Sequence, residues 1–135
     1  MIRGKIVKRR DLEKDSTYEP PLTVSDGINK KTVENARLLM GYAFIPPSGR
    51  NRRHYHVHTD AAGYVLKGRV RMILGPDHDK YEVDAETGDF FYYPRGEVHG
   101  LLNLSNTEPV ELISTYNSVG SKEEAGTVFV EPPWE

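Results

Sequence analysis

Apolar residues recur along this chain in short runs that are separated by glycine and proline. The clearest case is the segment Arg52–His58 (RRHYHVH), in which one kind of side chain returns at every second position. Alternation of this kind, with many β-branched and aromatic residues, is typical of short antiparallel strands. We expect strands in the following runs: Arg37–Ile45, Arg52–His58, Tyr64–Leu66, Arg69–Leu74, Lys80–Val83, Asp89–Tyr93, Val98–Leu104 and Val110–Tyr116.

Two segments lie outside this block of strands. The first contains a short strand-like run at Lys5–Val7 and an irregular arm at Tyr18–Asn29, and the second contains a strand-like run at Thr127–Glu131 followed by Trp134. We expect both segments to pack over the barrel or across a dimer. The predicted division is an N-terminal strand and arm over 1–36, a barrel over 37–119, and a C-terminal strand and tail over 120–135.

Composition narrows the class of protein. The 135 residues suffice for one domain, and the net charge of −2 with a pI near 6.2 gives no basic field for nucleic acid. No apolar run approaches the roughly 18 residues of a membrane span, and the N-terminus lacks the apolar core of a signal peptide. With no cysteine, thiolate ligands and disulfides are excluded. We therefore expect a cytoplasmic protein that binds neither nucleic acid nor membrane.

Histidines stand out as candidate metal ligands. His54, His56 and His58 occupy alternate positions, so a strand would direct all three to one face. Neutral imidazole is a common donor to Zn, Fe, Ni and Cu. Downstream, a second block carries His99 behind glycine and proline and ahead of an asparagine. Its spacing, G-x5-P-x-G-x2-H-x3-N, is set by Gly88, Pro94, Gly96, His99 and Asn103.

These two blocks together resemble the cupin superfamily. The resemblance implies an all-β, single-domain jelly-roll barrel (a double-stranded β-helix) with a metal ion held by His54, His56 and His99. In the family's first block a glutamate follows the two histidines and precedes a glycine by seven positions. When that glycine is Gly68, the glutamate position falls on Ala61, so this chain lacks the usual carboxylate.

A site of three neutral histidines leaves several positions open on the ion. We expect one divalent transition metal per chain, with Fe(II) favoured and Zn, Ni, Mn or Cu as alternatives. Open positions would let a small-molecule substrate and O₂ bind together. Three roles are open for His58: a fourth metal ligand, a pocket or acid–base residue, or a residue at the rim of the barrel. Arg52 could hold an anionic group of the substrate, and Tyr64 could act as a general acid.

Three functions remain open at this point. The favoured one is a metal-dependent enzyme of the three-histidine Fe(II) dioxygenase type acting on a small organic molecule. The second is a non-redox isomerase or lyase acting on a sugar or sugar acid with Zn, Ni or Mn. The third is a cupin that binds a small molecule without catalysis. In each case we expect a homodimer, because open barrel edges otherwise favour aggregation.

Overall fold

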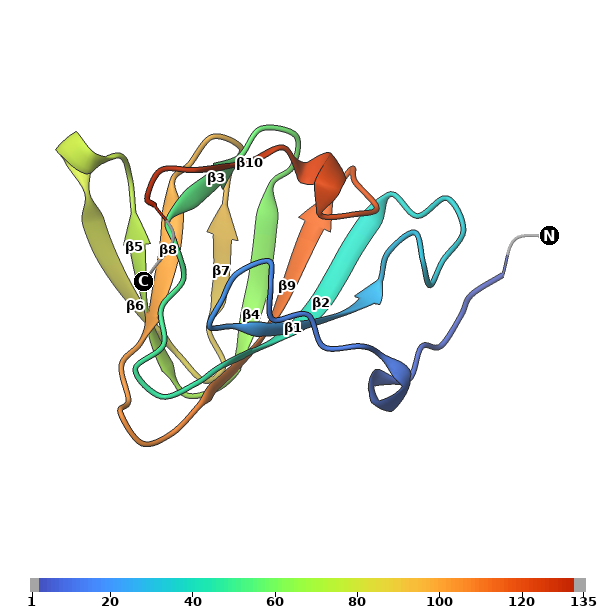
Figure 1. Ribbon diagram of the computed structural model, residues 1–135, viewed down its shortest axis with the longest axis horizontal. Coiled ribbons are helices and arrows are strands. Elements are labelled where there is room, and N and C mark those ends of the chain that lie inside the picture. The colour runs from blue at the N-terminus through green and yellow to red at the C-terminus, as the bar shows by residue number, and fades with distance from the viewer. Residues whose placement is uncertain (1–2, 133–135) are drawn as a thin grey trace.

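The computed structural model describes residues 3–132, which form two antiparallel sheets packed face to face (Figure 1). The first sheet has the strand order β1-β2-β9-β4-β7 and the second has the order β10-β3-β8-β5-β6. The strands are β1 (Thr23–Ile28), β2 (Leu38–Ile45), β3 (His54–His56), β4 (Ala61–Lys67), β5 (Arg69–Leu74), β6 (Tyr81–Glu86), β7 (Phe90–Tyr93), β8 (His99–Asn103), β9 (Val110–Asn117) and β10 (Thr127–Phe129). The predicted all-β jelly-roll class is confirmed.

The helical content of the described chain is small. Three 3₁₀ turns connect strands or precede them: η1 (Arg9–Asp11), η2 (Asp77–Asp79) and η3 (Glu123–Ala125). None of the helices formed by residues 3–132 has the length and apolar character needed to cross a membrane.

The core lies between the two sheets and explains the alternation in the sequence. In β2 the side chains of Leu39, Ala43 and Ile45 are buried, whereas Leu38 and Phe44 are exposed on the outer face. Successive side chains of a strand point to opposite faces, so one face of each strand supplies the core. The most deeply buried apolar strand residues come from both sheets: Ile45, Val65, Val70 and Val110.

The first strand lies later in the chain than the sequence indicated. The prediction of a strand over Lys5–Val7 is wrong, and β1 instead occupies part of the segment that we interpreted as an irregular arm. β1 pairs with β2 from Thr23 opposite Phe44, but its register shifts between Asp26 and Ile28. That irregularity interrupts the two-residue period, which hid the strand from pattern analysis.

The histidine-rich strand is shorter than predicted and lies between two others. β3 covers only His54–His56, with β8 on one side and β10 on the other. β10 pairs Thr127 with His56 and Phe129 with His54, so the predicted C-terminal strand is present within a shorter span. Trp134 lies outside the described residues.

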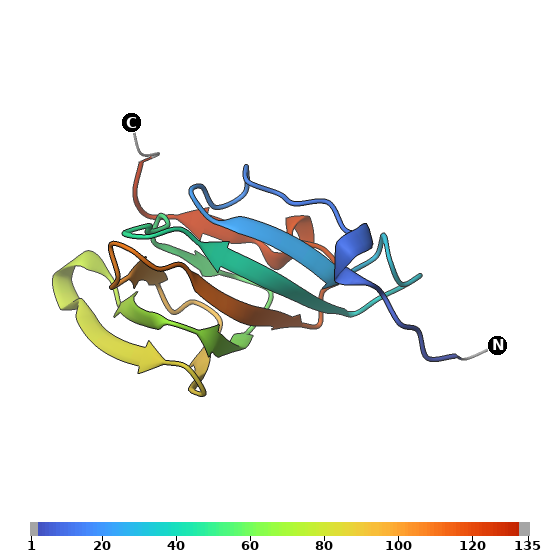
Figure 2. The ribbon, with the colours of Figure 1, turned by 90° about the horizontal axis from the view of Figure 1, so that it is seen from below.

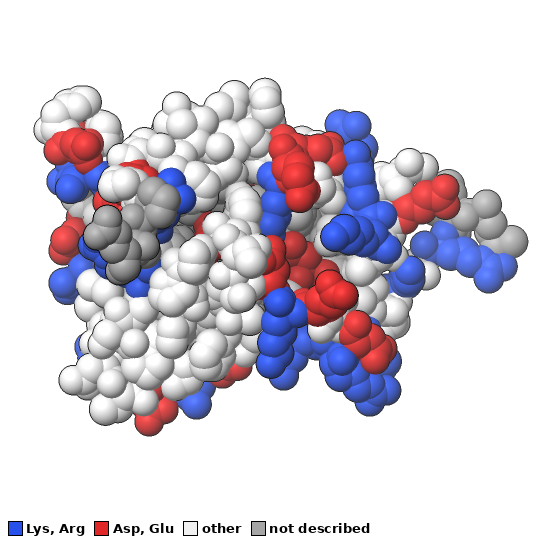
Figure 3. All heavy atoms as spheres, viewed as in Figure 1, with Lys and Arg blue, Asp and Glu red and all other residues white. Residues whose placement is uncertain are grey.

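The arm and β10 lie on the same side of the barrel. Figure 2 shows the arm passing beside β10, while the first described residues extend away from the body of the molecule. On the face drawn in Figure 3, charged side chains gather toward the end that carries the N-terminal segment, with Lys and Arg interspersed among Asp and Glu.

Candidate metal centre

The three predicted histidines converge inside the barrel. His54 and His56 lie two positions apart on one face of β3, and His99 of β8 is the direct cross-strand partner of His54. One nitrogen of each ring lies within 4.8 Å of the others, and all three residues are buried. Donor atoms gathered from adjacent strands into one buried point are suited to a single metal ion.

The second nitrogen of each histidine ring, Nδ1, makes a polar contact with a neighbouring residue. Nδ1 of His54 lies 2.8 Å from the carbonyl of Arg52, and Nδ1 of His99 lies 2.9 Å from the carbonyl of Glu97. Nδ1 of His56 lies 2.9 Å from the hydroxyl of Thr127 on β10. Contacts of this kind fix ring orientation and leave Nε2 for a metal. Within the described chain the buried Nε2 of His56 has no hydrogen-bond partner. A bound cation would provide this nitrogen with the partner that it lacks.

Burial keeps two of these rings in the form that binds metal. Desolvation lowers the pKa of His56 to about 3, and the nearby charge of His54 acts in the same direction. Desolvation also lowers the pKa of His99 to about 3. The ring of His99 stacks on Tyr93 with centroids 4.1 Å apart, and the ring of Tyr116 lies 4.7 Å from that of His56. Neutral imidazoles in an apolar setting offer their lone pairs to an ion without first losing a proton.

One further polar residue reaches the cluster, and it comes from the N-terminal arm. Oε1 of Glu19 lies 3.0 Å from Nε2 of His54, and the Glu19 side chain is only 13% exposed. Burial favours the neutral acid, but the hydrogen bond and charge of His54 outweigh it and hold the pKa of Glu19 below its usual value. Against the same desolvation, the hydrogen bond and charge of Glu19 raise the pKa of His54.

Sequence analysis missed Glu19. The family pattern has no place for a carboxylate ahead of its first block, and the chain offers 20 acidic residues without a spacing that singles out this one. The one available signal was the alanine at position 61, which implies that a carboxylate, if needed, must come from elsewhere.

A small cavity lies beside the histidines. Its volume is about 60 Å³, and most of its lining is apolar or aromatic, including Tyr93 and Tyr116. Charged side chains reach it from the terminal segments: Glu19 from the arm, Asp26 from β1 and Lys122 from the segment before β10. Space of this size accommodates a few water molecules or a very small organic molecule.

The other candidate residues lie away from this cavity. His58 is exposed beyond the end of β3, close to Gly126, and is outside the histidine cluster. Nε of Arg52 donates to the carbonyl of Glu131, and its guanidinium lies 3.9 Å from the ring centre of Phe129. Tyr64 packs edge-to-face against Phe90, which is 81% exposed. The structure therefore does not bring His58, Arg52 and Tyr64 together at the metal centre, and their catalytic roles stay predictions.

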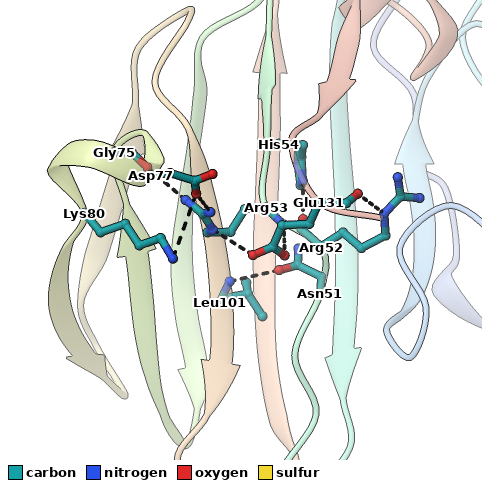
Figure 4. A network of polar contacts seen from close by, with 9 residues as sticks. All are labelled: Asn51, Arg52, Arg53, His54, Gly75, Asp77, Lys80, Leu101 and Glu131. Atoms are coloured by element: carbon teal, nitrogen blue, oxygen red, sulfur yellow. Dashed lines mark hydrogen bonds and ion pairs between the residues drawn. The ribbon is translucent and has the colours of Figure 1, made fainter. Parts of the chain in front are cut away.

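Behind the metal centre, a buried arginine ties the C-terminal segment to the barrel (Figure 4). Arg53 is 4% exposed, and its Nε donates to Oε1 of Glu131 at 2.8 Å. Its Nη1 donates to the carbonyl of Gly75 at 3.1 Å, and its Nη2 pairs with Asp77 at the η2 turn. This network fixes the residue next to His54 and holds the chain beyond β10 against β3.

Two residues of the second block, Asn103 and Gly96, have structural roles. Nδ2 of Asn103 donates to the carbonyls of Ile45, Pro46 and Glu108, which joins the loops at the ends of β2 and β8. Gly96 has a φ of +81°, a region that favours glycine, and its N–H donates to the carbonyl of His56. The proline–glycine loop is thereby attached to the histidine strand.

Comparisons with known proteins agree with this geometry. Residues 41–116 match the family model of the cupin domain. The chain is 29% identical over 110 residues to a germin-like protein, subfamily 2 member 4, of Arabidopsis thaliana, covering 79% of this chain and 48% of that protein. It is 31% identical over 110 residues to germin-like protein 5-1 of Oryza sativa subsp. japonica, covering 79% of this chain and 47% of that protein. The chain thus spans about half the length of these curated relatives.

Solved structures with the same fold include enzymes. One is an oxalate oxidase, with a TM-score of 0.70 and 22% identity over 91% of this chain and 62% of that one. Another is the polyketide cyclase RemF from Streptomyces resistomycificus, with a TM-score of 0.74 and 19% identity over 97% of this chain and 88% of that one. A third is the oxalate decarboxylase of Bacillus subtilis, with a TM-score of 0.74 and 18% identity over 95% and 33% of the two chains. At these identities the likeness is one of fold.

Proposed function

This chain belongs to the cupin domain family, and from that premise we propose that it is a metal-dependent enzyme acting on a small organic molecule. The observation that carries the proposal is the histidine cluster. Three buried imidazoles present Nε2 to one another while each Nδ1 contacts a backbone carbonyl or a hydroxyl. An apolar core has no need of three such rings, because buried polar groups must find partners.

The residues would divide the work in a simple way. His54, His56 and His99 would hold the ion, and the carbonyls of Arg52 and Glu97 would keep two of the rings oriented. A divalent metal in this position would act as a Lewis acid toward a substrate oxygen, and iron would add redox chemistry. The apolar walls around the cavity exclude bulk water, which strengthens the electrostatic interactions of a bound substrate.

Fe(II) dioxygenase chemistry is the reaction class that we place first. Its support is the three-histidine donor set with no carboxylate on the strands, which leaves positions for substrate and O₂.

The non-redox lyase or isomerase is the second candidate. The tightness of the cavity favours it, since 60 Å³ leaves little room for O₂ beside a substrate. The homodimer and the cytoplasmic location stay predictions.

Elemental analysis of the purified protein tests the shared premise of both candidates. We expect close to one equivalent of a divalent transition metal per chain, before or after reconstitution. His99→Ala should lower metal affinity at least about a hundredfold, because loss of a direct ligand exceeds the 10–100-fold cost of losing an orienting partner. Wild-type protein at a metal concentration 100 times the Kd should also gain about 2.7 kcal/mol of stability, which His99→Ala should forfeit.

The identity of the metal then separates the reaction classes. Iron, followed by O₂ consumption when the Fe(II) protein is mixed with a small chelating acid or diketone, would support the dioxygenase. Turnover with Zn, Ni or Mn and no O₂ consumption would support the lyase or isomerase. Full metal content in His99→Ala would contradict the assigned centre, and absence of metal from reconstituted wild-type protein would favour a binding protein without catalysis.

A further inference from the structure

The histidine strands leave one side of the metal centre without a protein donor. Ala61, at the start of β4, is 2% exposed and lines the same cavity as His54 and His99. Its methyl group cannot bind a cation, and it takes little of the space that a longer side chain at this position would fill. The cavity wall is therefore open to a side chain that approaches from another part of the chain.

Glu19 enters this cavity from the N-terminal arm. It lines the same cavity as Ala61, and its Oε1 lies 3.0 Å from Nε2 of His54. Two ligand atoms that are each about 2.1 Å from one ion and meet it at a right angle stand about 3.0 Å apart. The Glu19–His54 contact thus has the separation of neighbouring donors on a single metal. No other carboxylate of the described chain is seen to contact Nε2 of these histidines.

The arm that carries Glu19 is held in place on both sides. Paired backbone hydrogen bonds join Asp15 to Val24, and Leu22 is buried in the core. The hydroxyl of Tyr18 lies 2.6 Å from that of Thr127, the residue that also contacts His56. The Nζ of Lys122 lies 4.6 Å from the centre of the Tyr18 ring. A side chain on a segment with this many attachments is positioned by the fold.

We propose that Glu19 is the fourth protein ligand of the metal centre, so that the N-terminal arm supplies the carboxylate that position 61 lacks. The inference rests on the proposed function, because it requires the histidines to bind an ion. A carboxylate would reduce the net charge of the centre from +2 to +1 and add a hard oxygen donor, which suits Mn(II) and Fe(II). It would also make metal binding depend on the closure of the arm over the barrel.

Titration with Co(II) tests this proposal, because both affinity and the visible spectrum report the ligand set. We expect Glu19→Gln to lower Co(II) affinity at least about tenfold and to alter the absorption bands of the bound ion. Glu19→Asp, which keeps the charge but shortens the reach, should give a smaller loss. Glu13→Gln removes an exposed carboxylate from the same arm and should leave affinity and spectrum unchanged.

A rescue variant makes the assignment specific. Adding Ala61→Glu to Glu19→Gln restores a carboxylate on β4 and should recover affinity. Glu19→Gln could keep the wild-type affinity and spectrum while His99→Ala loses the ion. That result would overturn the role of Glu19 and would still support the histidine centre. Tighter binding in Glu19→Gln would also overturn it, since Glu19 would then obstruct the centre. Failure of the wild type to bind Co(II) would remove both proposals together.

Discussion

Two parts of the molecule meet at the cavity, and they are held in different ways. The histidines lie on β3 and β8, inside a sheet whose ladder of backbone hydrogen bonds fixes their spacing. Glu19 lies on the N-terminal arm, which is attached through side chains and a short backbone bridge, and Thr127 lies on β10, the three-residue strand at the edge of the sheet beside β3. The family match covers residues 41–116, so the strands that carry the histidines are inside it and both terminal segments are outside.

This difference shows how one barrel can keep a metal centre while its surroundings change. The histidine geometry follows from strand register, which a local substitution does not move. The carboxylate comes from the arm and the hydroxyl from β10, a three-residue edge strand, so both lie outside β3 and β8, the strands that carry the histidines. How strongly the terminal segments support the strands can be tested by substitution.

Breaking the anchor of the C-terminal segment should give the largest effect on stability. The Glu131 side chain is 18% exposed, and Arg53→Met would remove the guanidinium from which its carboxylate accepts a hydrogen bond. Removing one partner of a buried ion pair costs about 3 kcal/mol or more, because the remaining charge stays desolvated. We expect urea denaturation to show a loss of that size.

Arg71→Met is the matched control for this experiment. Nε of Arg71 lies 2.8 Å from Asp84, the same distance as in the Arg53–Glu131 pair, but its side chain is 36% exposed. An exposed pair of this kind contributes little to stability, because solvent and salt screen its charges. Equal losses in the two variants would show that burial of Arg53 does not anchor the C-terminal segment.

Much of the fold could be predicted from the sequence, for a physical reason. The alternating burial of strands such as β2 follows directly from the apolar pattern, and the spacing of the histidines indicates His54, His56 and His99 as the cluster that the structure contains. β1 was not predicted because a register shift interrupts the two-residue alternation of its side chains. Glu19 was not predicted because its position depends on how the arm folds back onto the barrel. That arrangement is set by contacts between residues more than 30 positions apart, such as those of Tyr18 with Thr127 and of Glu19 with His54.

A smaller effect is expected where the C-terminal segment contacts a histidine. Thr127→Val removes the hydroxyl that faces Nδ1 of His56 and keeps the shape of the side chain. Without that acceptor the ring can place its proton on Nε2, which blocks the donor atom. We expect metal affinity to fall about 10–100-fold, with little change in thermal stability. Thr127→Ser keeps the hydroxyl and should retain wild-type affinity; similar losses in both would point to packing.

The smallest effect is expected at Tyr64, on the far side of the first sheet. Its ring packs 4.9 Å from that of Phe90, whereas Tyr116 contacts His56 directly. Tyr64→Phe should change the free energy of unfolding by no more than about 0.5 kcal/mol and leave metal affinity unchanged. If Tyr64 is instead the general acid that its sequence position suggested, turnover would fall about 10²–10⁴-fold with metal affinity intact. Metal titration and turnover measured on the same variant therefore decide whether catalysis extends beyond the cavity that the strands and the arm enclose.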